Sequence, residues 1–165
     1  MAQLDIVEFP NEFLRTVTQE VTPIRPLAND VQTLIFNMIE TMYAHQALGL
    51  AAIQIGRLER IIVIDVDKLH SGKATGEPLV LINPVLEKLD GKMLLMREGC
   101  LSFPEQSVDI ERPSRIILNA FNIRGNPIRV GGDGDMLSRV LQHEYDHLEN
   151  RLMIDHVKKE IDTNA

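Results

Sequence analysis

The segment DMLSRVLQHEYDHLE, residues 135–149, contains the pattern from which the rest of the chain can be interpreted. Its apolar residues recur at helical spacing and predict a helix over about this range. These residues are Leu137, Val140, Leu141 and Leu148. His143 and His147 stand four residues apart, so their imidazoles lie one above the other on a single helix face.

Two imidazoles placed in this way can bind one metal ion, and Glu144 follows the first of them, where its carboxylate can reach a metal-bound water. Such a pattern occurs by chance in a chain of this composition on the order of 1% of the time, which is a small base rate for a motif match. The alternative is a solvated helix face on which acidic residues and histidines happen to meet. The pattern favours a hydrolytic metal site.

A catalytic tetrahedral site needs a third protein ligand. Asn150 and Met153 stand where a metzincin continuation requires glycine and histidine, and a glutamate ligand as late as Glu160 leaves little room for a following helix. The ligand is therefore expected upstream. Cys100 is the only thiol and follows Gly99, which allows close backbone approach. The alternatives for Cys100 are a buried small apolar residue and a nucleophilic Cys–His pair.

The remaining elements are predicted from periodicity and turn residues. Asn29 is expected to cap a helix over residues 29–44. Strands are expected at residues 61–66 and 79–82, with Pro84 ending the second, and Asp90-Gly91 is expected to form a hairpin turn into a strand at 93–96. A further hairpin joins residues 114–122 to 127–130, and residues 131–135 are expected to form a loop that lacks the ligand pattern of a calcium site. These elements predict a single α+β domain over residues 1–165, with the strands grouped between two helices.

Composition excludes several classes of protein. With 165 residues, 44% of them hydrophobic and 25% charged, the chain is typical of a globular domain. A net charge of −7 without a basic run argues against a binder of nucleic acid or anionic lipid. One cysteine excludes an internal disulfide, and the first residues lack the features of a signal peptide. The longest uncharged stretch of note, residues 41–56, is too short to span a membrane. We expect a soluble cytoplasmic monomer.

Three segments together resemble peptide deformylases: GLAAIQ at residues 49–54, EGCLS at 98–102 and QHEYDHL at 142–148. Their order and spacing agree with that family. The resemblance implies an α+β fold in which antiparallel or mixed β-sheets pack around a central metal-binding helix that carries the His-Glu-x-x-His pattern. It also implies removal of the N-formyl group from the terminal formyl-methionine of new polypeptides.

The resemblance further implies that Cys100, His143 and His147 hold one divalent metal ion. The family typically uses Fe²⁺, and Zn²⁺, Co²⁺ and Ni²⁺ suit the same ligands. A metal-bound water attacks the formyl carbonyl, with Glu144 as general base and then general acid. The side chain of Gln54 and the backbone N–H of Leu101 then stabilise the oxyanion.

By the same resemblance, an apolar pocket accepts the methionine side chain. Its expected lining is Leu48, Met96, Met136 and Val140, with Gly49 and Gly99 presenting backbone groups to the peptide. For each apolar residue the alternative is ordinary core packing. Glu98 and Arg112 are expected to form an ion pair that steadies the cysteine segment.

Three positions depart from the family pattern. Ala47 and Asn150 replace glycines; asparagine suits a left-handed helix C-cap, whereas alanine is strained if the backbone needs positive φ. Arg139 stands beside the pocket, where it either extends outward or alters peptide preference. The tail from His156 to Ala165 allows a brief final helix at most, whereas many bacterial members of the family have a longer one proposed to touch the ribosome. The expected partner there is the nascent chain.

Two other functions compete with deformylation. One is a metallopeptidase or amidase with a different substrate range. The other is a relative that binds formyl peptides or a partner without turnover. The intact Cys100, Glu144 and Gln54 argue against the second.

Overall fold

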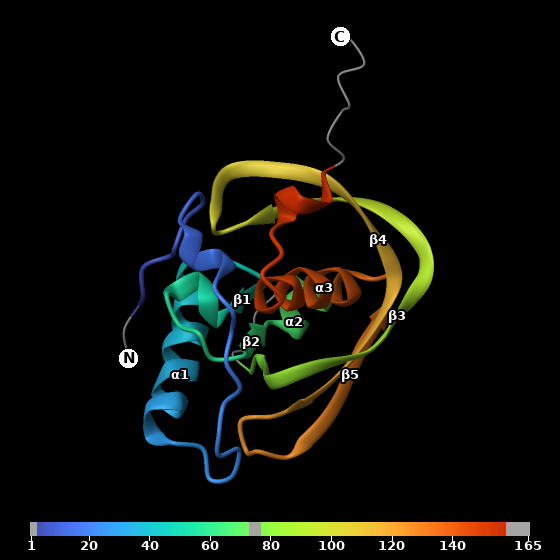
Figure 1. The fold of residues 1–165 in the computed structure, drawn as a ribbon. Helices are drawn as coiled ribbons and strands as arrows, with labels where there is room; N and C mark the ends of the chain where they lie inside the picture. The colour runs from blue at the N-terminus through green and yellow to red at the C-terminus, as the bar shows by residue number, and fades with distance from the viewer. Residues whose placement is uncertain (1–2, 73–76, 158–165) are drawn as a thin grey trace, which may run out of the picture.

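The computed structural model describes residues 3–72 and 77–157, and in this part of the chain five strands form one antiparallel sheet. The strands are β1 (Gly49–Ala51), β2 (Ile61–Ile64), β3 (Leu79–Cys100), β4 (Phe103–Phe121) and β5 (Pro127–Asp133), and they pair in chain order. The helices are α1 (Asn29–Ala44), α2 (Val66–Ser71) and α3 (Met136–Leu148), with short 3-10 turns η1 (Glu12–Arg15), η2 (Ala52–Ile55) and η3 (Met153–His156). The long strands β3 and β4 curve around α3 (Figure 1).

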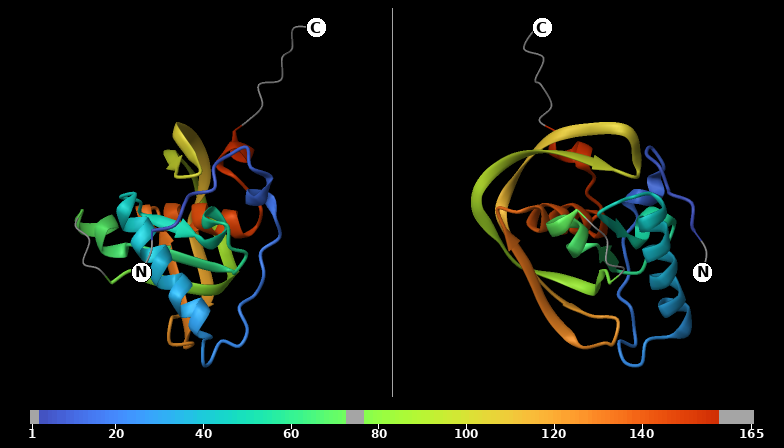
Figure 2. Two further views of the ribbon diagram at one scale, coloured as in Figure 1. Left: turned by 90° about the vertical axis from the view of Figure 1, so that its left-hand side faces the viewer. Right: turned by 180° about the vertical axis from the view of Figure 1, so that it is seen from behind.

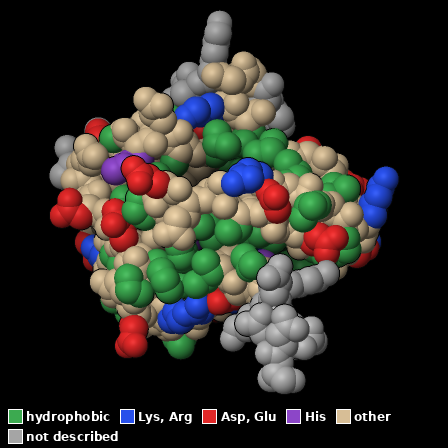
Figure 3. Space-filling model, turned by 90° about the horizontal axis from the view of Figure 1, so that it is seen from above, with side chains coloured by type: hydrophobic (Ala, Val, Ile, Leu, Met, Phe, Trp, Pro, Cys, Tyr) green, Lys and Arg blue, Asp and Glu red, His purple; other side chains and the backbone are tan. Residues whose placement is uncertain are grey.

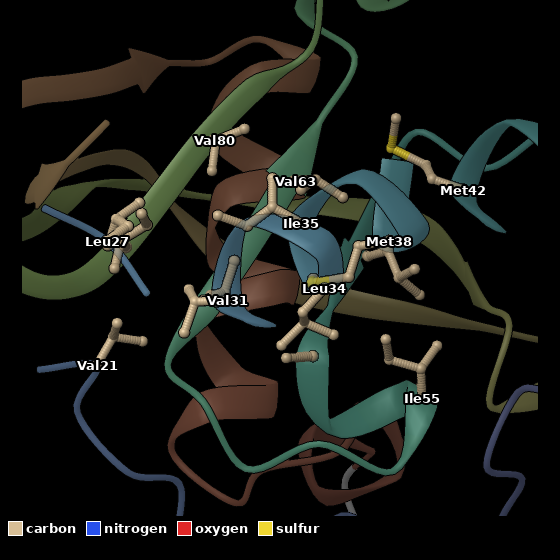
Figure 4. Packing of buried hydrophobic residues seen from close by; sticks show 14 residues of the cluster. Val21, Leu27, Val31, Leu34, Ile35, Met38, Met42, Ile55, Val63 and Val80 are labelled. Atoms are coloured by element: carbon tan, nitrogen blue, oxygen red, sulfur yellow. The ribbon is translucent and has the colours of Figure 1, made fainter. Parts of the chain in front are cut away.

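The two long helices pack on opposite faces of the β2 region. Ile61 and Val63 belong to the apolar cluster that contains α1, whereas Ile62 and Ile64 belong to the cluster that contains α3. Successive side chains of a strand point to opposite faces, so a strand covered on both sides is apolar at every position. Figure 4 shows the α1 cluster, and both views of Figure 2 show α1 at the outside of the molecule. None of the helices in the described residues is both long enough and apolar enough to cross a membrane.

The structure confirms the two predicted helices. α1 spans the predicted range, but its N-cap is Ala28 rather than Asn29, which already lies in the first turn. α3 begins after Asp135, whose carboxylate accepts a hydrogen bond from the backbone N–H of Ser138 at 2.7 Å. An aspartate in this position satisfies one of the free N–H groups of the first turn.

The predicted breaks in the middle of the chain are wrong. β3 continues through Pro84 and through Asp90-Gly91, where we expected an end and a hairpin turn. The pairing with β4 shifts register at both places, between Ile82 and Val85 and between Asp90 and Met93. Bulges of this kind accept a residue without an N–H donor or with positive φ, and they bend the strand. The reversal of direction lies instead at residues 101–102, between the paired Cys100 and Phe103.

Two further boundaries differ from the prediction. β2 ends at Ile64, because the Asp65 side chain accepts a hydrogen bond from Lys68 N–H and so caps α2. Residues 131–133 belong to β5 rather than to a loop. A Cβ on Gly131 would lie 2.5 Å from the carbonyl oxygen of Ile116, so the glycine is what lets β5 approach β4 here.

Candidate metal centre and active site

The end of β3 brings a thiol to the two histidines of α3. The Cys100 Sγ lies 3.3 Å from His147 Nε2, and one ligand atom from each of Cys100, His143 and His147 lies within 4.8 Å of the other two. Metal bonds of about 2.3 Å to sulfur and 2.0 Å to nitrogen place tetrahedral ligands about 3.5 Å apart. The three side chains therefore fit one transition-metal ion in spacing and in chemistry. The fold brings Cys100 to the two histidines although more than forty positions separate it from them in the sequence.

The charge state of His147 suits a ligand. Burial and, to a smaller extent, the charge of His143 together lower the pKa of His147 to about 3. Its Nδ1 is buried and has no hydrogen-bond partner in the described part of the chain. A neutral imidazole is the form that binds metal ions. His147 is therefore held ready to coordinate.

His143 is oriented by a buried carboxylate. Burial opposes a charge on His143, but hydrogen bonds with Cys100 and Glu98 raise its pKa well above the ordinary value. The Glu98 Oε2 lies 2.9 Å from His143 Nδ1, which leaves Nε2 for the metal. A carboxylate in this position fixes the ring and raises its basicity as a ligand.

Glu98 is itself held by two arginines. Arg112 donates to both of its oxygens at 2.7 and 3.0 Å, and Arg139 donates to Oε1 at 2.9 Å. Burial opposes ionisation of Glu98, but its hydrogen bonds with His143 and Arg112 lower its pKa below the ordinary range. The expected Glu98–Arg112 pair is thus present and buried. Arg139 also turns inward instead of extending to solvent, since it donates to the carbonyl oxygen of Leu94 at 2.6 Å.

The network continues to the C-terminal side of the site through residues that the sequence analysis missed. Arg112 donates to Asp146 at 2.6 Å, and the same carboxylate oxygen lies 2.7 Å from His156 Nε2. Arg151 pairs with the other oxygen of Asp146 at 3.1 Å. An acidic residue beside two predicted ligands is the signal that could have identified Asp146. Nothing in the sequence pattern pointed to His156.

Glu144 occupies a buried position and forms no salt bridge within the described residues. It is 4% exposed, and its Oε2 has no hydrogen-bond partner among the described residues. Burial raises its pKa to about 7. A Cβ on Gly49 would lie 2.7 Å from Glu144 Oε1, so the glycine makes room for this carboxylate. A carboxylate with a pKa near neutrality can both accept and return a proton at working pH.

Gln54 presents its amide to the cysteine segment. Its Oε1 accepts a hydrogen bond from Ala51 N–H at 2.9 Å, which assigns the orientation of the amide. Its Nε2 donates toward Cys100 Sγ at 3.4 Å and Ser102 Oγ at 3.3 Å. Leu101 lies between these two residues in the turn.

A cavity of about 1040 Å³ opens at this site. Most of the predicted site residues line it, namely Leu48, Gly49, Gln54, Gly99, Cys100, Leu101, Met136, Val140, His143 and Glu144. Met96, which is half-buried on β3, and His147, which is buried, do not line this cavity. The sequence analysis missed the wall formed by residues 3–6 of the N-terminal segment.

The two glycine replacements fit the backbone. Asn150 has φ of 60°, as expected for a left-handed C-cap, and Arg151 N–H donates to the carbonyl of Asp146 at 2.9 Å. Ala47 is not among the residues with positive φ; the neighbouring Gln46 takes that conformation with φ of 55°. Alanine at position 47 therefore does not suffer the strain of a side chain on a backbone with positive φ.

Comparison with known proteins gives one family. The family model described as Polypeptide deformylase matches residues 3–162. A peptide deformylase of Chromohalobacter salexigens is 41% identical over 157 residues, which cover 95% of this chain and 87% of the relative. A peptide deformylase of Bartonella quintana is 40% identical and covers 93% of this chain and 84% of its own length.

Solved structures agree with these relatives. The crystal structure of a peptide deformylase from Thermotoga maritima has a TM-score of 0.84 and 36% identity, and the match covers 96% of this chain and all of the other. A peptide deformylase from Synechococcus elongatus, in complex with actinonin, also has a TM-score of 0.84 and 36% identity, over 95% of this chain and 80% of that one.

Proposed function

This chain belongs to the polypeptide deformylase family of metal-dependent hydrolases, and from that premise we propose that it removes the formyl group from formyl-methionyl peptides. The family removes N-formyl groups from nascent peptides. The observation that carries the proposal for this chain is the convergence of Cys100, His143 and His147, with Glu144 beside His143 in the lining of the cavity.

We propose that Cys100, His143 and His147 hold a divalent metal ion. Thiolate and imidazole ligands suit Fe²⁺, Zn²⁺, Co²⁺ and Ni²⁺, and we expect Fe²⁺ to be the natural one. When bound, such an ion supplies Lewis acidity and brings the pKa of a coordinated water toward neutrality. Glu98 keeps His143 in the coordinating orientation.

The chain's own groups would then direct the proton and the oxyanion. Glu144 accepts the proton of the attacking water, because burial has brought its pKa to about 7, and delivers it to the departing amine. The Gln54 Nε2 and the backbone N–H of Leu101 donate to the formyl oxygen as it becomes negative. The apolar lining of the cavity, including Leu48, Met136 and Val140, accepts the methionine side chain.

We propose that the 165 residues act as one catalytic domain in the cytoplasm on chains leaving the ribosome. A thiol ligand suits a reducing compartment. The face seen from above carries separate groups of hydrophobic, acidic and basic side chains rather than one basic field, which fits a protein that does not bind nucleic acid (Figure 3). A monomer stays our prediction, although β3 exposes a row of large apolar side chains that the sequence did not indicate, at Val85, Leu86, Leu89, Met93 and Leu95.

The decisive experiment compares matched substrates. Protein loaded with Fe²⁺ or Ni²⁺ should release formate from a formyl-Met peptide and leave the acetyl-Met peptide intact. Cys100→Ser should lose most of the bound metal together with the activity, whereas Glu144→Ala should keep the metal and lose hydrolysis. Equal cleavage of both peptides would indicate an amidase of broader range. Binding of the formyl peptide without turnover by the metal-loaded protein would indicate a non-catalytic relative.

A further inference from the structure

Ser102 has a buried hydroxyl that contacts Gln54, the proposed oxyanion donor. It is fully buried in the turn between β3 and β4. Its Oγ lies 3.3 Å from Gln54 Nε2, and this is the one hydrogen bond of its side chain within the described residues. Its carbonyl oxygen accepts from Phe9 N–H at 2.8 Å, which fixes the backbone of the turn independently of the hydroxyl. The hydroxyl is therefore not needed to hold the turn in place.

The Gln54 amide is fixed at its other end. Ala51 N–H donates to its Oε1 at 2.9 Å, and Val7 N–H donates to the Gln54 carbonyl oxygen at 2.7 Å. The bond from Ala51 assigns which end of the amide is Nε2 and anchors Oε1, but the amide plane can still rotate about its terminal torsion. The two N–H bonds of Nε2 move with that rotation. One of them faces Cys100 Sγ at 3.4 Å and the other faces Ser102 Oγ.

An oxyanion donor works only if it is already aimed where negative charge develops. A carboxamide whose second N–H lacks an acceptor can turn about its terminal torsion, because this torsion is broad and weakly restricted. The hydroxyl of Ser102 gives that second N–H an acceptor and leaves the first for a substrate oxygen near the cysteine. A misplacement of about 1 Å is enough to reduce a rate considerably.

We propose that Ser102 is a positioning residue for deformylation, which holds one N–H of Gln54 so that the other meets the formyl oxygen. The inference rests on the proposed function and deepens it. In this role Ser102 affects catalysis only through Gln54. A merely structural hydroxyl would differ, because its loss would destabilise the folded state whichever residue stands at position 54.

A double-mutant cycle tests this dependence. Ser102→Ala should lower kcat about 10-fold with KM changed less than about 2-fold, since Ser102 is fully buried and does not line the cavity. In a Gln54→Ala background, where kcat has already fallen about 10²–10³-fold, the same change should have almost no further effect. Gln54→Glu supplies a second background, because it keeps the acceptor for Ala51 N–H while removing both N–H donors. Ser107→Ala, which removes an exposed hydroxyl from the same hairpin, should leave kcat unchanged.

Nitrogen NMR supplies a readout that does not depend on turnover. The side-chain NH₂ signals of Gln54, assigned from their loss in Gln54→Ala, should move in Ser102→Ala and stay in place in Ser107→Ala. Equal losses of kcat in both backgrounds, or unmoved Gln54 signals, would overturn the role of Ser102 while leaving deformylation intact. A wild-type protein that is metal-loaded and inactive on formyl-Met peptides would instead overturn the proposed function, and the role of Ser102 with it.

Discussion

The helices α1 and α3 cover opposite faces of β2, and they bury very different chemistry. The buried residues of α1 are apolar except for Thr41, whereas α3 buries Arg139, Glu144, Asp146 and His147 beside its apolar residues. Apolar burial stabilises a fold, while buried charges are costly unless they are paired. The comparison indicates that the α1 face supplies stability, and we propose that the desolvated groups of the α3 face serve catalysis. Substitutions on the two faces should therefore separate activity from stability.

The largest expected effect is at Glu144. Glu144→Gln should lower kcat by about 10²–10⁴-fold, because it removes the group that we propose transfers the proton. The free energy of unfolding should change by less than about 1 kcal/mol, since Oε2 of Glu144 has no hydrogen-bond partner among the described residues and the amide has the same shape. Activity assays measure kcat, and urea unfolding measures the free energy of unfolding. Glu12→Gln, at an exposed position in η1, is the charge-matched control and should alter neither quantity. If Glu144→Gln lowered the free energy of unfolding by several kcal/mol, the α3 face would also supply stability, and the proposed difference between the two helix faces would be wrong.

Arg112 should affect both stability and the metal site. Arg112→Met removes the partner shared by Glu98 and Asp146 and should lower the free energy of unfolding by about 3–5 kcal/mol. Metal affinity should fall about 10–100-fold, because Glu98 then orients His143 less firmly. Chemical denaturation and metal titration measure the two effects. Arg115→Met on the same strand, whose pairs with Asp133 and Asp90 are partly exposed, should change stability by less than about 1 kcal/mol.

A substitution in the α1 cluster should act on stability alone. Ile35→Val removes one methylene from a fully buried position and should lower the free energy of unfolding by about 1 kcal/mol. The kcat of the folded protein should stay the same, because α1 contributes no group to the metal centre. Phe36→Leu, at an exposed neighbour on the same helix, should have little effect on either. A change in kcat without a change in stability would show that the two faces are coupled.

The smallest expected effect lies at the surface pair between η1 and η3. Hydrogen bonding with Arg15 lowers the pKa of Asp155 below its ordinary value of 3.8. This pair therefore stabilises the folded state above pH 3.8, and its contribution disappears as the pH falls through the lowered pKa. Asp155→Asn should be less stable than wild type by at most about 1 kcal/mol at neutral pH, because both side chains are partly exposed. Unfolding curves of the two proteins should converge in acid, and a gap that widens in acid would contradict this sign.

The sequence was most informative where a local pattern is compatible with only one local structure. Histidines four residues apart share a helix face whatever surrounds them, and a β-branched run such as residues 61–64 is buried on both sides. Cys100 followed from the need for a third ligand and from its being the only thiol, whereas the resemblance added Gln54 and Glu98, which local patterns could not have joined to the helix. The predicted breaks at Pro84 and Gly91 failed because propensity describes an isolated segment, while a long paired neighbour can absorb such residues in bulges.

The sequence alone thus predicted the groups that we propose bind a metal and transfer a proton. Only the tertiary structure decided how those groups are supported: that Arg139 turns inward to Glu98, that Asp146 and His156 extend the network, and that Ser102 faces Gln54. These contacts join residues that are distant in the chain, through bulges and a turn that no local rule specifies. The physical reason is that burial and hydrogen-bond partners depend on the whole packed fold, whereas the identity of a ligand depends on its own side chain.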